Sequence, residues 1–280
     1  MIWRYGLSDR RMAKTLSQIS DDSKNHDMGI TMPVSGEILT EKRVDFLKSL
    51  LNDRFEIAVH GFHHEDFSIH SAERLMKDIS KAKKVFEEYG FHLTGYRAPY
   101  LKSRKGLLPL LAESGFSYSS SGSVIMDWTL AKNRNLLAEA DKIASDIYEL
   151  KRVNKADFDR PYGLMDIPVS LPDDEILIDR MGIHDDDLLG SILEDVIRAS
   201  LASLSFAVIQ IHPERYLQMR KALLSVVDKL LSEGEVSFVT LRDLSDHLKS
   251  RTSSDLVPGE KKIVCITGDL DIMSLGDLWR

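Results

Sequence analysis

The chain has 280 residues, of which 43% are hydrophobic, so it can bury the core of one large domain or of one domain with an appendage. Its formal net charge is -7, and the 37 basic residues form no basic stripe, which argues against a nucleic-acid partner. No apolar run approaches the roughly 20 residues that cross a bilayer, and the first residues lack the apolar core of a secretory signal. The single cysteine, Cys265, excludes an internal disulfide and a thiolate zinc cage, which fits a reducing compartment. We therefore expect a cytoplasmic protein, and the lack of an apolar span argues against a membrane partner.

Segments with strand-like and helix-like spacing of apolar residues alternate along the chain. The segments expected as strands are, in chain order, 3–7, 29–34, 55–59, 93–96, a short one near 118, 123–126, 164–168, 206–211 and 236–240. The segments expected as helices are 12–25, 41–51, 72–89, 107–115, 188–204, 217–231 and 241–248. Residues 133–160 are highly charged and are expected as an exposed helix and loop, residues 171–174 as a turn and residues 251–254 as a linker.

Seven or eight strand–helix units predict an α/β protein of the (β/α) barrel type. Residues 1–250 would form the barrel, and residues 251–280 would add a linker and a short C-terminal strand and helix as an extension. The active site of such a barrel lies at the C-terminal ends of its strands. Polar residues that directly follow the predicted strands are therefore the candidates for chemistry.

The residues that meet this condition are Asp9, His60, His64, Arg97, Asp127, Trp128 and His212. Chance would scatter them over both faces of the barrel. The neutral imidazole is the commonest side-chain metal ligand, and His60 and His64 can close on one ion if a carboxylate from elsewhere completes the set. We therefore expect a divalent metal ion, with zinc as the first choice.

Four short motifs occur in the order in which they occur in a known family. They are His60-Gly61-Phe62-His63-His64, Arg97-Ala98-Pro99-Tyr100, Asp127-Trp128 and Ile209-Gln210-Ile211-His212-Pro213. Over about residues 1–250 the chain resembles the NodB-homology polysaccharide deacetylases, also called carbohydrate esterase family four. The resemblance implies a distorted (β/α) barrel and a metal-dependent hydrolase that removes N-acetyl groups from an amino sugar or a polysaccharide.

The resemblance also implies roles for the residues of these motifs. His60 and His64 would be metal ligands, Arg97 would orient the catalytic aspartate, and the backbone N–H of Tyr100 would help to bind the oxyanion. His212 would be the general acid that donates a proton to the departing amine, and Asp127 would help to hold it protonated. Trp128 would offer a flat apolar face to the acetyl methyl or to a sugar ring, with ordinary core packing as the alternative.

This chain departs from the first motif of the family. The family's motif ends in two adjacent aspartates, a general base and a metal ligand, whereas the matching segment of this chain is Leu7-Ser8-Asp9-Arg10. We favour Asp9 as the ligand, because a cationic Arg10 cannot occupy a ligand position beside a divalent ion. The alternatives are that Asp9 is the base, or that it only caps the following helix.

Two further questions stay open at this point. The missing acid motivates a catalytically silent glycan-binding or protein-binding member of the same fold as the alternative function, and hydrolysis of a ureide or another small amide is the nearest variant of the enzyme. The tail carries Asp269 and Asp271 after an apolar run. Either these acids reach the metal site of their own or a neighbouring chain, or the tail is an extra strand that covers a sheet edge.

Overall fold

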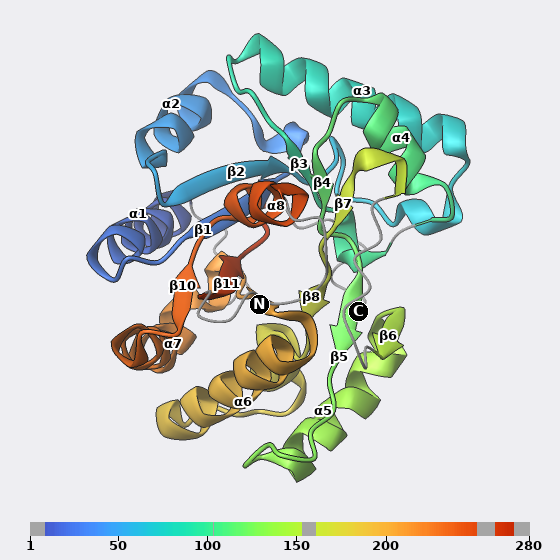
Figure 1. Cartoon of the computed structure of the whole chain (residues 1–280). Coiled ribbons are helices and arrows are strands. Elements are labelled where there is room, and N and C mark those ends of the chain that lie inside the picture. Colours follow the sequence, from blue (N-terminus) through green and yellow to red (C-terminus); the bar gives the residue numbers. More distant parts are fainter. Residues whose placement is uncertain (1–8, 103, 153–160, 251–260, 272–280) are drawn as a thin grey trace.

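The structure is a computed structural model that describes residues 9–102, 104–152, 161–250 and 261–271. Parallel strands form a curled ring, and helices surround it (Figure 1). The strands are β1 (Ile30–Val34), β2 (Phe55–Val59), β3 (Gly95–Tyr96), β4 (Tyr118–Ser119), β5 (Ser123–Ile125), β6 (Leu150–Arg152), β7 (Met165–Asp166), β8 (Val169–Ser170), β9 (Phe206–Gln210), β10 (Val236–Phe238) and β11 (Lys262–Thr267). The α-helices are α1 (Asp9–Asn25), α2 (Glu41–Leu50), α3 (Ala72–Glu88), α4 (Leu107–Glu113), α5 (Arg134–Ile147), α6 (Asp186–Leu204), α7 (Pro213–Glu233) and α8 (Leu241–Ser250).

The strands form two sheets that together make the ring. The larger sheet runs in the order β9-β11-β1-β2-β3-β4-β7, with β10 beside the first half of β11, and the smaller one in the order β6-β5-β8. The two sheets meet where the N–H of Val208 in β9 donates to Oγ of Ser170 in β8, at 3.3 Å. Strands β1, β2 and β9 are buried along their whole length, as expected for parallel strands covered on both faces. The predicted α/β barrel is confirmed.

The last strand, β11, differs from the expected C-terminal extension. It pairs with β9 from Ile263 to Thr267 on one side, and its end pairs with β1 on the other, where Thr267 lies opposite Thr31. Its residues from Ile263 onward are buried. A continuous apolar run is typical of a central parallel strand rather than of an edge. Residues 262–271 are therefore an integral part of the barrel, and the tail does not cover a sheet edge.

Most other elements lie where their apolar spacing predicts them. The strand expected at 3–7 lies outside the described residues. Within the segment 133–160, the described part up to residue 150 is less exposed than expected, because α5 buries Leu137, Ala140 and Ala144 at helical spacing. Helix α5 leads into β6, which pairs with β5, and residues 153–160 lie outside the described residues. No helix among the described residues is long and apolar enough to cross a bilayer.

Local capping sets the helix ends that matter for the site. Ser71 precedes α3, and its side chain accepts the N–H of Arg74, as the sequence predicts for a cap. Helix α7 begins directly after His212, because Pro213 is favourable at the first helical position and cannot continue the strand. His212 is thereby held at the junction between β9 and α7, at the C-terminal end of the barrel.

Candidate active site

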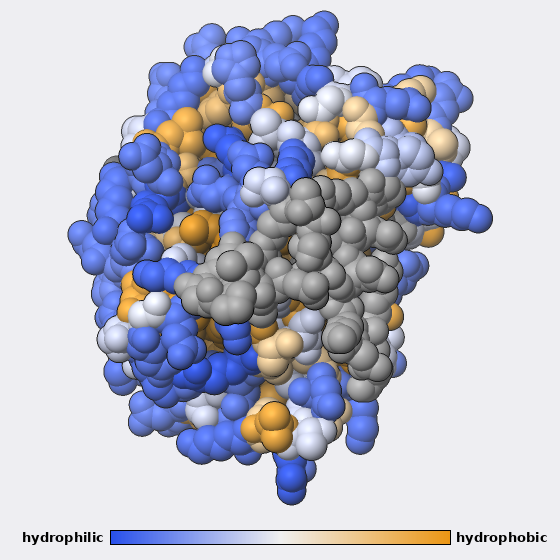
Figure 2. Space-filling view, in the orientation of Figure 1, coloured by the Kyte–Doolittle hydropathy of each residue, from blue (hydrophilic) through white to orange (hydrophobic). Residues whose placement is uncertain are grey.

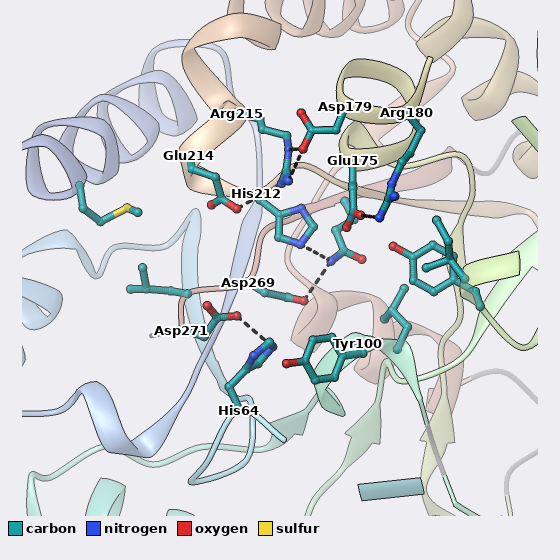
Figure 3. Close-up of a pocket in the computed structure, with 16 residues that line it drawn as sticks. His64, Tyr100, Glu175, Asp179, Arg180, His212, Glu214, Arg215, Asp269 and Asp271 are labelled. Atoms are coloured by element: carbon teal, nitrogen blue, oxygen red, sulfur yellow. Dashed lines mark hydrogen bonds and ion pairs between the residues drawn. The ribbon is translucent and has the colours of Figure 1, made fainter. Parts of the chain in front are cut away.

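A cavity of about 330 Å³ opens at the C-terminal ends of the strands (Figure 3). Its polar walls come from four parts of the chain: the loop after β2, the segment after β3, the π-helix Glu175–Arg180 with the start of α7, and the end of β11. Apolar side chains of Met12, Leu101, Ile147 and Leu270 complete the lining. Figure 2 shows that hydrophilic residues predominate on the face seen there, with hydrophobic residues scattered among them.

His60 is fully buried at the end of β2. Its Nδ1 lies 3.0 Å from the backbone oxygen of Arg97, which can only accept, so Nδ1 carries the proton and Nε2 carries the lone pair. Nε2 has no hydrogen-bond partner among the described residues and faces Asp269 and Asp271, at 3.7 and 4.0 Å from their carboxylate oxygens. Burial is the largest cause that lowers the pKa of His60 to about 4, which keeps the ring neutral near pH 7.

His64 and Asp271 complete a cluster with His60. His64 Nε2 lies 3.0 Å from Asp271 Oδ2 (Figure 3), and the ring centroids of the two histidines are 5.2 Å apart. Burial raises the pKa of Asp271, but the hydrogen bond and the charge of His64 outweigh it and lower this pKa to about 2. One potential ligand atom from each of the three residues lies within 4.8 Å of the others.

This cluster fits a divalent metal ion. The buried Nε2 lone pair of His60 faces carboxylate oxygens, an arrangement that is repulsive unless a cation lies between them. Two imidazoles and one carboxylate are the ligand set of catalytic zinc sites, which leave a position open for water or substrate. His60 donates its second ring nitrogen to a backbone carbonyl, as metal-bound histidines usually do. We infer that His60, His64 and Asp271 would hold the ion.

Asp269 follows β11 and is held by two donors. Arg97 Nη1 donates to Asp269 Oδ1 at 3.0 Å, and Gln210 Nε2 donates to Oδ2 at 2.9 Å. Arg97 is itself fully buried, and it also donates to Oγ1 of Thr267 and to the backbone oxygen and Oγ of Ser120. Burial raises the pKa of Asp269, but His60 and Arg97 together lower it below its usual range. Asp269 is therefore an ionised carboxylate with a fixed orientation beside the cluster of His60, His64 and Asp271.

His212 forms the opposite side of the site. Its Nδ1 lies 2.7 Å from Asp174 Oδ1, and its backbone N–H donates to the other oxygen of Asp174. Gln210 Nε2 lies 3.1 Å from His212 Nε2, so the same amide group links His212 to Asp269. Burial lowers the pKa of His212, but Asp174 raises it well above the usual value. The Gln210 N–H acts in the opposite sense, because it favours a lone pair on Nε2; the direct charge of the buried Asp174 is the stronger influence.

Tyr100 lies between the histidine loop and the cavity. Its backbone adopts a φ of 61°, which is uncommon for a residue with a side chain, and its ring packs at 4.3 Å from the His64 ring. Unusual backbone angles of this kind concentrate at functional sites. The structure thus brings Arg97, Tyr100, His60, His64 and His212 together at one end of the barrel, as the sequence predicts.

Two predicted site residues, Asp127 and Trp128, do not join this group. Asp127 is exposed and accepts hydrogen bonds from Thr129, so the carboxylate beside His212 is Asp174 and not Asp127. Trp128 is buried and donates to Asp141, and neither Asp127 nor Trp128 lines the cavity; core packing, the alternative for Trp128, is what the structure shows.

The role expected of Asp9 stays a prediction. Asp9 is the first residue of α1, and its side chain lies outside the described residues. Among the described carboxylates, Asp271 lies 3.0 Å from His64 and Asp269 lies 3.7 Å from His60, and both follow the last strand.

Part of the chain matches a known protein family. Residues 9–119, which include the histidine loop and the Arg97–Tyr100 segment, match the family model of polysaccharide deacetylases. The resemblance to the NodB-homology polysaccharide deacetylases is confirmed. A search of curated protein sequences finds no significant match.

Solved structures with a similar fold include members of this family. The Puue allantoinase aligns with a TM-score of 0.61 and 16% identity over 86% of this chain and 74% of that chain. A probable polysaccharide deacetylase from Pseudomonas aeruginosa PAO1 aligns with a TM-score of 0.58 and 13% identity over 85% of this chain and 73% of that chain. At these identities the likeness establishes the shared polysaccharide deacetylase fold.

The resemblance places an acid pair in the first motif, but in this chain two acids close to the site follow the last strand. Asp269 contacts Arg97, and Asp271 contacts His64, and both follow the last strand in the sequence. In space, β11 lies directly beside β1. The sequence signal for this arrangement is the apolar run 263–267 followed by two acids; the signal for Asp174 is weaker, because Asp173-Asp174 also suits an ordinary turn.

Proposed function

We propose that the chain is a metal-dependent hydrolase that removes N-acetyl groups from an amino sugar or a glycan. The observation that carries this proposal is the convergence of three groups around one cavity: the His60, His64 and Asp271 cluster, the oriented Asp269, and the Asp174-paired His212. Amide hydrolysis needs a polarised carbonyl, an activated water and a proton donor for the leaving nitrogen. Each of these tasks has a candidate residue here.

The described residues can divide the reaction between them. A divalent ion held by His60, His64 and Asp271 would lower the pKa of a water molecule and polarise the acetyl carbonyl. Asp269 would take a proton from the attacking water, and the Tyr100 backbone N–H would donate to the oxyanion. His212 would then give its Nε2 proton to the nitrogen as the C–N bond breaks, releasing acetate and an amine.

The alternative of a catalytically silent member loses its motivation. That alternative rested on a missing second acid in the segment around Asp9. Asp269 and Asp271 supply a base and a ligand from β11, and Arg97 holds the base as the family resemblance implies. With these assignments, each task of hydrolysis has a candidate residue in this chain.

The test is a measurement of metal content together with amine release. The purified protein should hold one divalent ion per chain and should release amine from N-acetylated sugars or their oligomers, and a chelator should abolish both. His64→Ala should lose the ion and the activity, while His63→Ala should retain much of both. A ureide added to the same screen tests the nearest variant of this function, in which the enzyme hydrolyses a ureide or another small amide. A wild-type protein with neither metal nor amine release would contradict the proposal.

Replacing the carboxylate beside His212 should move the pH dependence of turnover. Because Asp174 raises the pKa of His212, the acid stays protonated above its ordinary range, and activity should fall on the alkaline side only when His212 loses its proton. The neighbouring Glu214 also raises this pKa, and Arg215 lowers it. In Asp174→Asn the alkaline limb should therefore shift to lower pH, measured as kcat against pH.

Asp127→Asn is the matched control for this experiment. Asp127 is the carboxylate that the sequence placed beside His212, but its carboxylate contacts Thr129. Its removal should leave the alkaline limb unchanged. A shift in Asp127→Asn together with an unchanged limb in Asp174→Asn would reverse the assignment of the two carboxylates.

A further inference from the structure

A buried carboxylate outside the cavity contacts the loop that carries the metal ligands. Asp78 lies on α3 and is 5% exposed. Its Oδ2 accepts the backbone N–H of Phe62 at 2.8 Å, and its Oδ1 accepts the backbone N–H and the Nδ1–H of His63 at 3.1 and 2.8 Å. Removing a carboxylate from water costs several kcal/mol unless hydrogen bonds compensate it. All three of these hydrogen bonds come from the loop between His60 and His64.

The loop backbone is shaped to receive this carboxylate. Gly61 has a φ of +73°, and a Cβ added there would lie 3.1 Å from Asp78 Oδ2 and 3.1 Å from the backbone oxygen of His63. Glycine adopts this left-handed conformation without steric cost. Gly61 therefore permits both the turn and the close approach of Asp78.

A second carboxylate holds the loop from its other side. Glu37 Oε1 accepts the N–H of His64 at 3.0 Å, while the N–H groups of Gly36 and Glu37 donate to the carbonyls of Gly61 and Phe62, both at 2.9 Å. Asp78 and Glu37 thus satisfy the three successive amides of Phe62, His63 and His64. The chain between the two ligand histidines is fixed to α3 on one side and to the segment after β1 on the other.

From this geometry we propose that Asp78 is a positioning residue for the metal site, acting through His63 and the backbone of the ligand loop. The inference rests on the proposed metal-binding function of His60 and His64. Without the carboxylate, the amides of Phe62 and His63 would lose their acceptors, and the turn at Gly61 would relax. The imidazoles of His60 and His64 would then no longer be held in the geometry that one ion requires. His63 is thereby a partner of Asp78 and not a ligand.

The test is the affinity for Zn²⁺ measured by competition with a chelator, together with melting temperatures of the metal-free proteins. Asp78→Asn and Asp78→Ala should weaken Zn²⁺ binding by about 10–100-fold, the usual effect of losing a group that orients metal ligands. The matched control is Asp22→Asn, because Asp22 is also a buried carboxylate, but its partners are Tyr216, Arg220 and Gln18. This control should lower the melting temperature and leave the Zn²⁺ affinity unchanged.

His63 provides a second pair of variants that does not disturb a buried carboxylate. His63→Ala removes the Nδ1–H donor to Asp78 and should weaken Zn²⁺ binding severalfold, whereas His63→Asn keeps a donor near the same place and should restore it. Wild-type affinity in Asp78→Asn, or equal affinity in the two His63 variants, would overturn the positioning role. If the wild-type protein binds no divalent ion, the proposed function itself fails. If the wild-type protein binds the ion and Asp78→Asn binds it equally well, only the positioning role fails, so the two failures are distinguishable.

Discussion

Replacing Asp269 with asparagine should lower turnover by about 10²–10⁴-fold, the range expected for loss of a general base, and should leave one metal ion per chain. Asparagine keeps an oxygen that can accept from Arg97, but it cannot take a proton from water. Asp269 is ionised in the folded protein, since His60 and Arg97 keep its pKa below the usual range despite burial. The measurement is kcat on an N-acetylated sugar together with metal content.

Asp271→Asn is the control that separates the two acids of β11. Asp271 contacts His64, so its loss should first reduce the metal content and only through that the turnover. The two substitutions should therefore differ in metal loading, although both lower activity. If Asp269→Asn turns over like the wild type, Asp269 is not the base; if it loses the metal as Asp271→Asn does, Asp269 acts as a ligand.

Deleting residues 256–280 should prevent the barrel from folding, and not merely inactivate it. The deletion removes β11, so that β9 loses its pairing partner and β1 keeps only β2. The buried apolar side chains lost include Ile263, Val264 and Ile266. Each such side chain contributes about 1.5–3 kcal/mol on burial, and a whole domain is typically stable by only about 5–15 kcal/mol.

Circular dichroism and thermal unfolding measure this effect directly. The truncated protein should lack a cooperative transition, while the double variant Asp269→Asn, Asp271→Asn should keep one, because it retains the strand and changes only its polar end. A truncated protein that unfolds cooperatively at the wild-type temperature would show that β11 is dispensable for the fold, contrary to its place between β9 and β1.

The sequence by itself determined the alternation of elements and one half of the site. Local spacing of apolar residues is a property of neighbouring positions, so α3 with its Ser71 cap and the strand before His60 could be predicted without a structure. The pair His60 and His64 is also local, because only three loop residues separate the two histidines. His212 could be placed because a buried strand ends directly before it.

The tertiary structure alone decided which distant residues complete the site. Asp269 and Asp174 are far from His60 and His212 in sequence, and their roles depend on which strands are neighbours in the ring. Strand order is set by long-range pairing, and in this chain the last strand pairs beside the first described one, against the order of the sequence. Asp127 occupied a plausible sequence position, but a carboxylate enters the site only if its strand ends there. The neighbours of β11 place Asp269 and Asp271 beside His60 and His64.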